Sequence, residues 1–429
     1  MRSRGMKSGR HSRRIRVSIV GVVAISTISL TGLGVGSASS SAAQAVAGVT
    51  KNTVTIGVST PETGALAQEW GYGLAAMKAE FAYQNAHGGV NGRKIKIVVE
   101  DDQGSNATQL TAAESLVQVK HVFGMINFSP AVGDQAFLSQ NGVPVVSNSV
   151  QHLYSNIFTI VGNVDPNSND FSTTIGKIFK KIGAKKVGTL ALNVEAQVIA
   201  AGQNGVTSSV DAGLQAGYSA YVPFGVTDWT PYVLGFQTSD TDGFWPQLDA
   251  ASAIGFMTTA AQQGLKLKSV FVNGYATNPY LIKPLVSVDQ GTTVLSYFAP
   301  IELHSKAAEN EAAVLKKYGH INSTDNAFTT WGYVAALLEI QGLQGAGKAL
   351  TRQGFISHLA RVTNWTADGL EAAPVNFETT NTVLEEGSNN CDWILQIKGS
   401  KYVPVGTKPI CGTLQYSQPT STTTTTVAP

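Results

Sequence analysis

Cysteine is almost absent from this chain, with only Cys391 and Cys411 among 429 residues. Two thiols without companion ligands at a usable spacing do not make a zinc site, which needs four ligands. The seven histidines are scattered, and no G-x-S-x-G nucleophile elbow occurs. We therefore predict a protein that is not an enzyme and that needs no metal and no cofactor.

Charged residues are also scarce, at 14% of the chain, but seven basic residues crowd the first 16 positions without any acid. An apolar stretch follows from Val17 to about Val35, and Ala43-Gln44-Ala45 has the A-x-A pattern of a cleavage site. We therefore expect residues 1–45 to be an export signal. An uncleaved membrane anchor is the alternative, because roughly 20 apolar residues span a bilayer. No cysteine follows the apolar stretch, so the usual lipid-anchor site is missing.

Without this segment the acids exceed the bases by about five, which removes the electrostatic basis for a nucleic-acid partner. In an oxidising location Cys391 and Cys411 are expected to form one disulfide that closes a loop of the last strands. Two free buried thiols are the alternative. The low-complexity, threonine-rich residues 417–429 cannot build a core and are expected to be a disordered tail.

Between these ends, short β-rich runs alternate with helical patterns, which predicts an α/β fold. A first set of strands is predicted at Thr53–Ser59, Lys94–Val99, Val122–Phe128 and Val143–Ser147. A helical stripe from Phe171 to Ile182 opens a second set, with strands at Val187–Asn193, Tyr218–Phe224, Ser269–Asn273 and Thr293–Phe298. The pattern is mainly helical from Ser305 to Leu359, and short strands dominate after Pro374. Two such sets predict two α/β lobes.

The stretch PETGALAQEWGYG, residues 61–73, follows the first predicted strand and raises the question of a nucleotide-binding site. Gly71-x-Gly73-x-x-Ala76, with acids at 100–102 after the next strand, resembles a dinucleotide fingerprint. The glycines of that fingerprint must turn directly after the strand, whereas about ten residues separate them from it here. We predict instead a long loop with Trp70 near its tip, at the sheet edge where open α/β folds bind ligands.

Four segments carry a family resemblance: VTIGVSTPETGALAQEWG, QNAHGGVNGRKIKIVVEDDQGS, NGVPVVSNSV and TDWTPYVLGFQ. With them the chain resembles the type I periplasmic solute-binding proteins, in particular the leucine/isoleucine/valine-binding branch served by ABC importers. The resemblance implies two Rossmann-like lobes joined by a three-strand hinge that closes on the ligand. The first lobe would comprise 53–164 and 299–372, and the second 165–298 and 373–416.

The resemblance also implies a set of ligand-binding residues. Hydroxyl and backbone N–H groups near Ser129 and at Ser149, Val150 and Gln151 would hold a ligand carboxylate. Trp70 would cover the ligand side chain, and Asp165 would lie near its ammonium group. Each has a plainer alternative, because Ser149 and Asp165 also suit ordinary turns and Trp70 suits simple packing.

One departure from the family pattern bears on selectivity. Tyr275 stands where amino-acid binders have a glutamate for the ligand ammonium, and Trp245 falls near a second aromatic position. An amine would lose one of its charge partners there. Branched-chain amino acids, amides, aromatic acids and other small carboxylates all suit a cleft lined by hydroxyl groups and capped by aromatic rings, so the ligand stays open.

We therefore expect the substrate-binding protein of an ABC importer, with a small-molecule ligand and a membrane permease as partners. It is expected to be a monomer outside the cytoplasm. A secreted ligand-sensing receptor module of the same fold is the alternative, since a fold does not decide between these functions.

Overall fold

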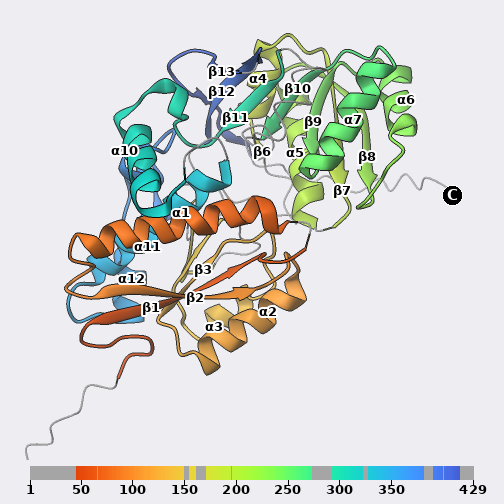
Figure 1. Cartoon of the computed structure of the whole chain (residues 1–429). Coiled ribbons are helices and arrows are strands. Elements are labelled where there is room, and N and C mark those ends of the chain that lie inside the picture. The colour runs from red at the N-terminus through yellow and green to blue at the C-terminus, as the bar shows by residue number, and fades with distance from the viewer. Residues whose placement is uncertain are drawn as a thin grey trace, which may run out of the picture. The chain divides into compact units, whose positions relative to one another are not determined.

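The structure is a computed structural model that describes residues 45–64, 66–148, 154–160, 171–194, 196–272, 291–321, 327–380, 390–399 and 401–415. The expected export signal, apart from its last residue, and the threonine-rich tail lie outside these ranges. Among the helices in these ranges, none has both the length and the apolar character of a membrane span. Two sheets organise the described part of the chain (Figure 1).

The first sheet has five parallel strands in the order β2-β1-β3-β4-β5. Its strands are β1 (Thr53–Thr60), β2 (Lys94–Asp101), β3 (Gly124–Asn127), β4 (Val145–Ser147) and β5 (Ile157–Thr159). Every residue of β3, β4 and β5 is buried, because helices cover both faces of a parallel sheet. Such strands appear in the sequence as continuous apolar runs, and the predicted strands here are confirmed within a few residues.

Helices cover both faces of this sheet (Figure 1). On one face, α1 (Ala67–Ala86) packs along α11 (Ala327–Ala346), with α10 (Lys306–Val314) and α12 (Arg352–Leu359) beside them. On the other lie α2 (Asn106–Glu114) and α3 (Gln135–Gln140). Single π-helical turns, Ser115–Val119 and Leu315–Gly319, extend α2 and α10. The late helical block therefore packs on the first sheet, far from it in sequence.

The second sheet has the strand order β13-β12-β11-β10-β9-β7-β8, and β14 pairs with β12. Strands β7 to β11 run parallel, whereas β12 is antiparallel to β11, β13 and β14. The strands are β7 (Lys186–Leu192), β8 (Gln215–Val222), β9 (Gly243–Gln247), β10 (Lys268–Val272), β11 (Thr293–Ser296), β12 (Cys391–Lys398), β13 (Lys401–Pro404) and β14 (Ile410–Cys411).

The helices of the second sheet belong to different core clusters. Residues of α6 (Thr230–Thr238) and α7 (Ala250–Gln262) pack in one cluster, and residues of α4 (Thr174–Lys181) in another. The sheet also contacts α5 (Ala196–Asp211). The helical stripe predicted from Phe171 begins only at Thr174, because β6 (Phe171–Ser172) pairs with β15 (Leu414–Gln415).

The chain passes from the second sheet into the first lobe directly after β11. Phe298 is already buried in the core of the first lobe, and Ala299 N–H donates to the Leu370 carbonyl (2.7 Å). Val375 and Phe377 belong to the same core, so packing of the first lobe continues past the boundary predicted at 372. The remaining short elements are the 3-10 turns Ile301–Leu303 and Ala367–Gly369 and the helix α13 (Phe377–Thr380).

Candidate functional site

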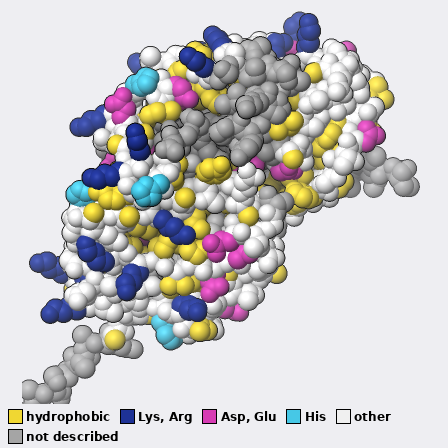
Figure 2. Space-filling model, viewed as in Figure 1, with side chains coloured by type: hydrophobic (Ala, Val, Ile, Leu, Met, Phe, Trp, Pro, Cys, Tyr) yellow, Lys and Arg dark blue, Asp and Glu magenta, His cyan; other side chains and the backbone are white. Residues whose placement is uncertain are grey.

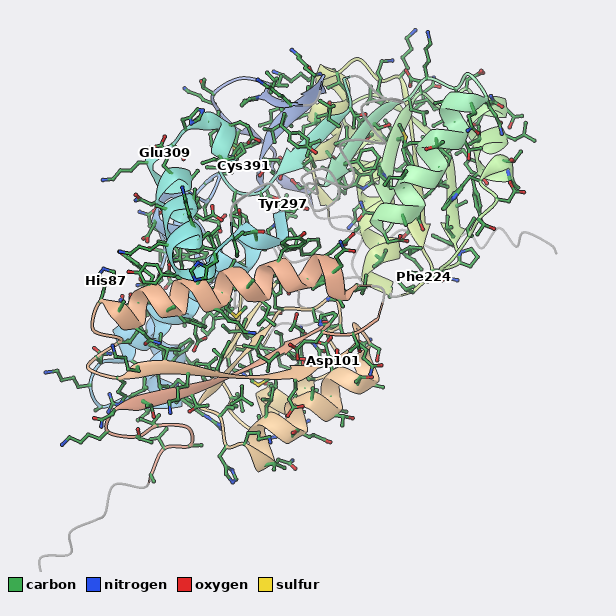
Figure 3. The ribbon with its side chains drawn as sticks, viewed as in Figure 1. His87, Asp101, Phe224, Tyr297, Glu309 and Cys391 are labelled. Atoms are coloured by element: carbon green, nitrogen blue, oxygen red, sulfur yellow. A yellow bond between two sulfur atoms is a disulfide. The ribbon has the colours of Figure 1, made fainter. Side chains whose placement is uncertain are left out.

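Polar residues follow the strands of the first sheet at the edge where all five parallel strands end. This is the edge at which open α/β sheets bind their ligands. Figure 3 shows Asp101 at the carboxyl end of β2. In Figure 2, acidic side chains gather at this end of the first lobe, and most Lys and Arg side chains in view lie toward its other end. The candidate site is therefore polar and acidic on the side of the first lobe.

Asp101 holds the loop that follows β1. Its carboxylate accepts the N–H groups of Glu62 (2.9 Å), Thr63 (3.3 Å) and Gln103 (3.0 Å), and also the Thr63 hydroxyl. Burial alone would raise the pKa of Asp101, but these hydrogen bonds outweigh it and lower the pKa. In a nucleotide-binding fold an acid at this place would bind the ribose, whereas here Asp101 fixes the loop that follows β1.

Asp102 is buried and faces a different set of groups. It accepts the Ser59 hydroxyl (2.8 Å) and the Gly104 N–H (2.8 Å). Burial raises the pKa of Asp102, against the effect of these donors. The adjacent carboxylates of Asp101 and Asp102 therefore serve different loops and do not form an acid–base pair.

The loop after β3 uses its hydrogen-bond donors internally. Ser129 donates its N–H to Asn148 Oδ1 (3.0 Å). Ala131 N–H donates to Ser129 Oγ (3.2 Å), and Val132 N–H donates to Asn106 Oδ1 (2.8 Å). Residue 130 is proline and has no N–H. Groups near Ser129 were predicted to hold a ligand carboxylate; in this conformation the Ser129 N–H has a protein partner, and the role of its hydroxyl stays a prediction.

A second buried acid lies behind this loop. Asp134 accepts the Asn127 side-chain amide at both oxygens (2.8 and 3.0 Å). Burial raises the pKa of Asp134 to about 7, and the nearby charge of Asp102 adds to the shift. Neither Asp134 nor Asn148 was singled out from the sequence. The only signal for Asn148 was its place directly after β4, whereas Asp134 lies immediately before α3.

Trp70 lies in the first turns of α1 and not near the tip of a loop, because the helix begins at Ala67. The side chain is buried, and its ring packs against Phe128 (centroids 5.0 Å apart) and Phe328 (4.8 Å). The expectation of a long loop was therefore wrong. That Trp70 covers the ligand side chain stays a prediction. The alternative, simple packing, accounts for the contacts that Trp70 makes with Phe128 and Phe328.

Gly71 and Gly73 are both inside α1, so they form no phosphate-binding turn. A Cβ at Gly73 would lie 2.2 Å from the Phe128 ring, whereas one at Gly71 would meet nothing within 4 Å. Gly73 therefore permits close packing between α1 and its neighbours, which explains a glycine in mid-helix despite its cost there.

Trp245 lies in β9, a strand that the sequence analysis missed. Its side chain is buried in the core, and its indole N–H donates to the Ala201 carbonyl (2.9 Å). A Cβ at Gly205 would lie 2.2 Å from the indole nitrogen, so α5 covers the ring closely. Trp245 was predicted to bind ligand, but these contacts give it a packing role.

The other predicted ligand residues, Ser149, Val150, Gln151, Asp165 and Tyr275, lie outside the described residues. Asn148, which binds Ser129, is the residue directly before the first of them. Across the described ranges, no three His, Cys, Asp or Glu side chains are grouped so as to hold a metal ion.

The two cysteines form the predicted disulfide. Cys391 of β12 and Cys411 of β14 are register partners, with their Cα atoms 4.0 Å apart. Close by, the Lys177 ammonium donates to the Cys411 carbonyl (2.9 Å), and the Thr174 hydroxyl donates to the Asn390 carbonyl (2.6 Å). The disulfide therefore ties β14 to β12, and the two hydrogen bonds hold the same region against α4.

Comparisons with known proteins identify a family and several solved structures that are similar to this chain. A family model described as periplasmic binding protein matches residues 53–401. A search of curated proteins finds no match. A branched-chain amino acid ABC transporter protein from Thermus thermophilus, solved with bound valine, has a similar structure (TM-score 0.69, 19% identity, 84% of this chain and 97% of that chain).

Two further solved structures are similar. A fatty acid ABC transporter substrate-binding protein from Thermomonospora curvata has a TM-score of 0.67 and 19% identity, over 84% of this chain and 92% of that chain. A solute-binding protein of an ABC transporter from R. palustris, in complex with 4-hydroxybenzoate, has a TM-score of 0.67 and 18% identity, over 84% and 98%. With a family model that spans most of its length, this chain belongs to the periplasmic binding protein family, which is a family of non-enzymatic solute-binding proteins.

Proposed function

We propose that this protein is the extracytoplasmic substrate-binding component of an ABC importer, and that it captures a small amino acid or another small carboxylate between two lobes by hinge closure. The observation that carries the proposal is the edge of the first sheet where its five parallel strands end, because polar residues are buried along that edge. The chain crosses from one sheet to the other near Phe298, as a hinge of this kind requires.

A carboxylate is the group that the ligands of the similar structures share. Valine, 4-hydroxybenzoate and a fatty acid differ in size and in the presence of an amine, but each carries a carboxylate. The N–H groups of Ser129, Ala131 and Val132 have partners within the protein. We therefore assign the ligand carboxylate to the residues that follow β4, namely Ser149, Val150 and Gln151. Hydroxyl and backbone N–H groups suit a carboxylate that must be released again.

The aromatic cluster on the same side suits an apolar ligand side chain. Trp70, Phe128 and Phe328 pack together at this end of the first lobe. We propose that Trp70 covers the ligand, and that Phe128 and Phe328 move aside when the two lobes close. Transport is favoured over sensing because the similar solved structures are named as ABC transporter components.

A thermal-shift screen of the purified protein tests the proposal. The panel comprises leucine, phenylalanine, 4-methylpentanoate, 3-phenylpropanoate and 4-hydroxybenzoate, with the amides of the first two as controls that lack a carboxylate. A ligand that binds only the folded state at one hundred times its Kd stabilises it by about 2.7 kcal/mol, which raises Tm measurably. If no carboxylate raises Tm, or if amides raise it as much as acids, the assignment of a carboxylate ligand fails.

A further inference from the structure

The amino ends of the parallel strands of the first sheet meet at the edge opposite the candidate ligand site. The segments that converge there contain Lys and Arg but no acid, and we call their Lys and Arg residues the basic edge. The segments are 45–54, 91–96, 118–124, 139–145 and 344–353, and the residues are Lys51, Arg93, Lys94, Lys96, Lys120, Lys348 and Arg352. At the carboxyl ends of the strands, by contrast, 59–64, 100–105 and 127–134 contain acids and no base. The first lobe therefore separates its charges along the strand direction.

Hydrogen bonds join the segments of the basic edge to one another. Arg352 Nη2 donates to the Val122 carbonyl (2.9 Å), which joins α12 to the start of β3. Arg93 Nε donates to the Thr50 carbonyl (2.8 Å), which joins the start of β2 to the segment before β1. Both guanidinium groups bind neutral carbonyl oxygens here. These bonds fix the basic residues in one place and leave their positive charge uncompensated.

The side chains of the basic edge are available to a partner. Its five lysines are all exposed, and among the described residues no side chain of the basic edge forms an ion pair. In Figure 2, most Lys and Arg side chains in view lie toward this end of the first lobe. Val119, directly before Lys120, is apolar and 68% exposed. Exposed lysines with an apolar side chain among them suit contact with an anionic membrane surface.

The chain enters the first lobe at the basic edge. Thr55 N–H donates to the Gly48 carbonyl (2.8 Å), and a Cβ at Gly48 would lie 2.3 Å from the Phe123 nitrogen, so this segment lies against the start of β3. Residues 1–44 come directly before it and contain seven Lys and Arg residues, no acid and an apolar stretch. A segment of that composition is directed to a membrane, and the part of the folded protein next to it is the basic edge.

We propose that the basic edge is a docking surface for anionic phospholipid headgroups. Its lysine ammonium groups approach the headgroup phosphates, and Val119 enters the interface beside Lys120. The basic residues come from the starts of three strands and one helix, so they form a broad surface that suits a membrane better than a single small anion. Docking would keep the protein close to a membrane whatever ligand it carries, so it goes beyond the function proposed above and does not depend on it.

Co-sedimentation of the purified full-length protein with lipid vesicles tests the proposal. Vesicles of equal parts phosphatidylglycerol and phosphatidylcholine are compared with vesicles of phosphatidylcholine alone, which report any binding by the apolar N-terminal stretch. At low salt the partition coefficient is expected to be at least about tenfold higher for the anionic vesicles, because each lysine near such a surface adds to binding. At about 1 M salt, where the Debye length is about 3 Å, the difference should disappear. Equal partition into both vesicles at low salt overturns the proposal.

Two variants, each with four Lys→Gln substitutions, separate the basic edge from net charge. The first variant carries Lys51→Gln, Lys96→Gln, Lys120→Gln and Lys348→Gln. The second changes four exposed lysines of the second lobe and carries Lys181→Gln, Lys266→Gln, Lys401→Gln and Lys408→Gln. The first is expected to bind anionic vesicles at least about tenfold more weakly, and the second to stay within about twofold of wild type. Unchanged Tm values confirm that both are folded. An equal loss in the two variants would show that net charge alone is responsible, and the proposal fails.

Val119→Ser distinguishes a membrane from a soluble polyanion. An apolar side chain that enters the lipid interface adds to vesicle binding, so its loss should weaken binding to the anionic vesicles by about threefold. Binding to soluble polyphosphate, which offers charge without an apolar interface, should not change. If the wild type binds polyphosphate but prefers neither kind of vesicle, the partner of the basic edge is an anionic polymer and the membrane proposal is wrong.

Discussion

Gly73 of α1 and Gly332 of α11 meet backbone to backbone. A Cβ placed on Gly332 would lie 2.0 Å from the Gly73 carbonyl oxygen, far inside any allowed contact. The two helices therefore approach as closely as their main chains permit, on the face of the first sheet that carries Trp70. Gly73, one of the two glycines that suggested a nucleotide fingerprint, thus belongs to a helix–helix contact.

We expect Gly332→Ala to destabilise the protein and Gly71→Ala to stabilise it. The first adds a methyl group where none fits, and overpacking of this kind costs about 1–3 kcal/mol. The second adds a methyl group at an exposed position of α1 with nothing within 4 Å, and alanine exceeds glycine in helices by roughly 0.5–1 kcal/mol. Urea unfolding of both variants measures the difference. Opposite signs are required; two destabilised variants would refute the packing argument.

The disulfide between Cys391 and Cys411 is expected to stabilise the second lobe. Closing a loop with a sequence separation of 20 limits the unfolded chain and is worth about 3 kcal/mol in the chain-entropy model. Reduction should therefore lower Tm by several degrees, and the Cys391→Ser/Cys411→Ser protein should match the reduced wild type. Alkylation before mass analysis supplies the control, since two thiols that react without reductant would show that the bond is absent.

The strands could be located from the sequence better than the site could. Apolar runs rich in Val and Ile mark β1, β3 and β4, because strands buried on both faces need such residues. The strand β9 was missed, since proline at 246 and glycine at 243 argue against a strand. Pairing with β10 involves only Gly243 and Phe244, so the missing N–H of Pro246 lies beyond that ladder.

The site residues were harder to predict because their partners come from distant segments. Ser129 was predicted to lie at the ligand, and its N–H is bound to Asn148, which lies 19 residues further along the chain. Trp245 was predicted to lie at the ligand, whereas its indole N–H donates to the Ala201 carbonyl. The sequence contains only two cysteines, so only one disulfide was possible, and that pairing is confirmed.

A buried glutamate makes the stability of the first lobe depend on pH between about 4.5 and about 8. Glu311 of α10 is buried, and burial raises its pKa to about 8, against the effect of a hydrogen bond with Thr330. The folded pKa exceeds the unfolded value, so the folded state holds the proton more tightly. Stability should therefore fall as pH rises from about 4.5 to about 8, and then level off.

Glu311→Gln should remove this loss. The variant is expected to match wild type near pH 4 and to exceed it at pH 8 or above, by an amount on the order of a few kcal/mol. Thermal unfolding across this range measures it. Glu309→Gln, at an exposed position of the same helix, is the control and should follow the wild-type curve. An equal pH dependence in wild type and Glu311→Gln would exclude Glu311 as its source.

Ligand selectivity is the last prediction and rests on Tyr275. A buried ammonium without a charge partner costs several kcal/mol, and aromatic faces offset only about 1–2 kcal/mol of it. Asp165 would then be the one acid predicted to face the amine. We therefore expect this protein to discriminate weakly between an amino acid and the same molecule without its amine, or to prefer the latter.

Calorimetry decides between these outcomes with two matched pairs, leucine with 4-methylpentanoate and phenylalanine with 3-phenylpropanoate. Within each pair the apolar part is identical, so the ratio of the two Kd values isolates the amine. A ratio within about tenfold in either direction is at most about 1.4 kcal/mol and is what a partly compensated ammonium would give. An amino acid that binds more than about a hundredfold tighter than its partner, about 2.7 kcal/mol, requires a full charge partner for the amine. In that case Tyr275 does not mark a lost carboxylate, and Asp165→Asn should then abolish the preference.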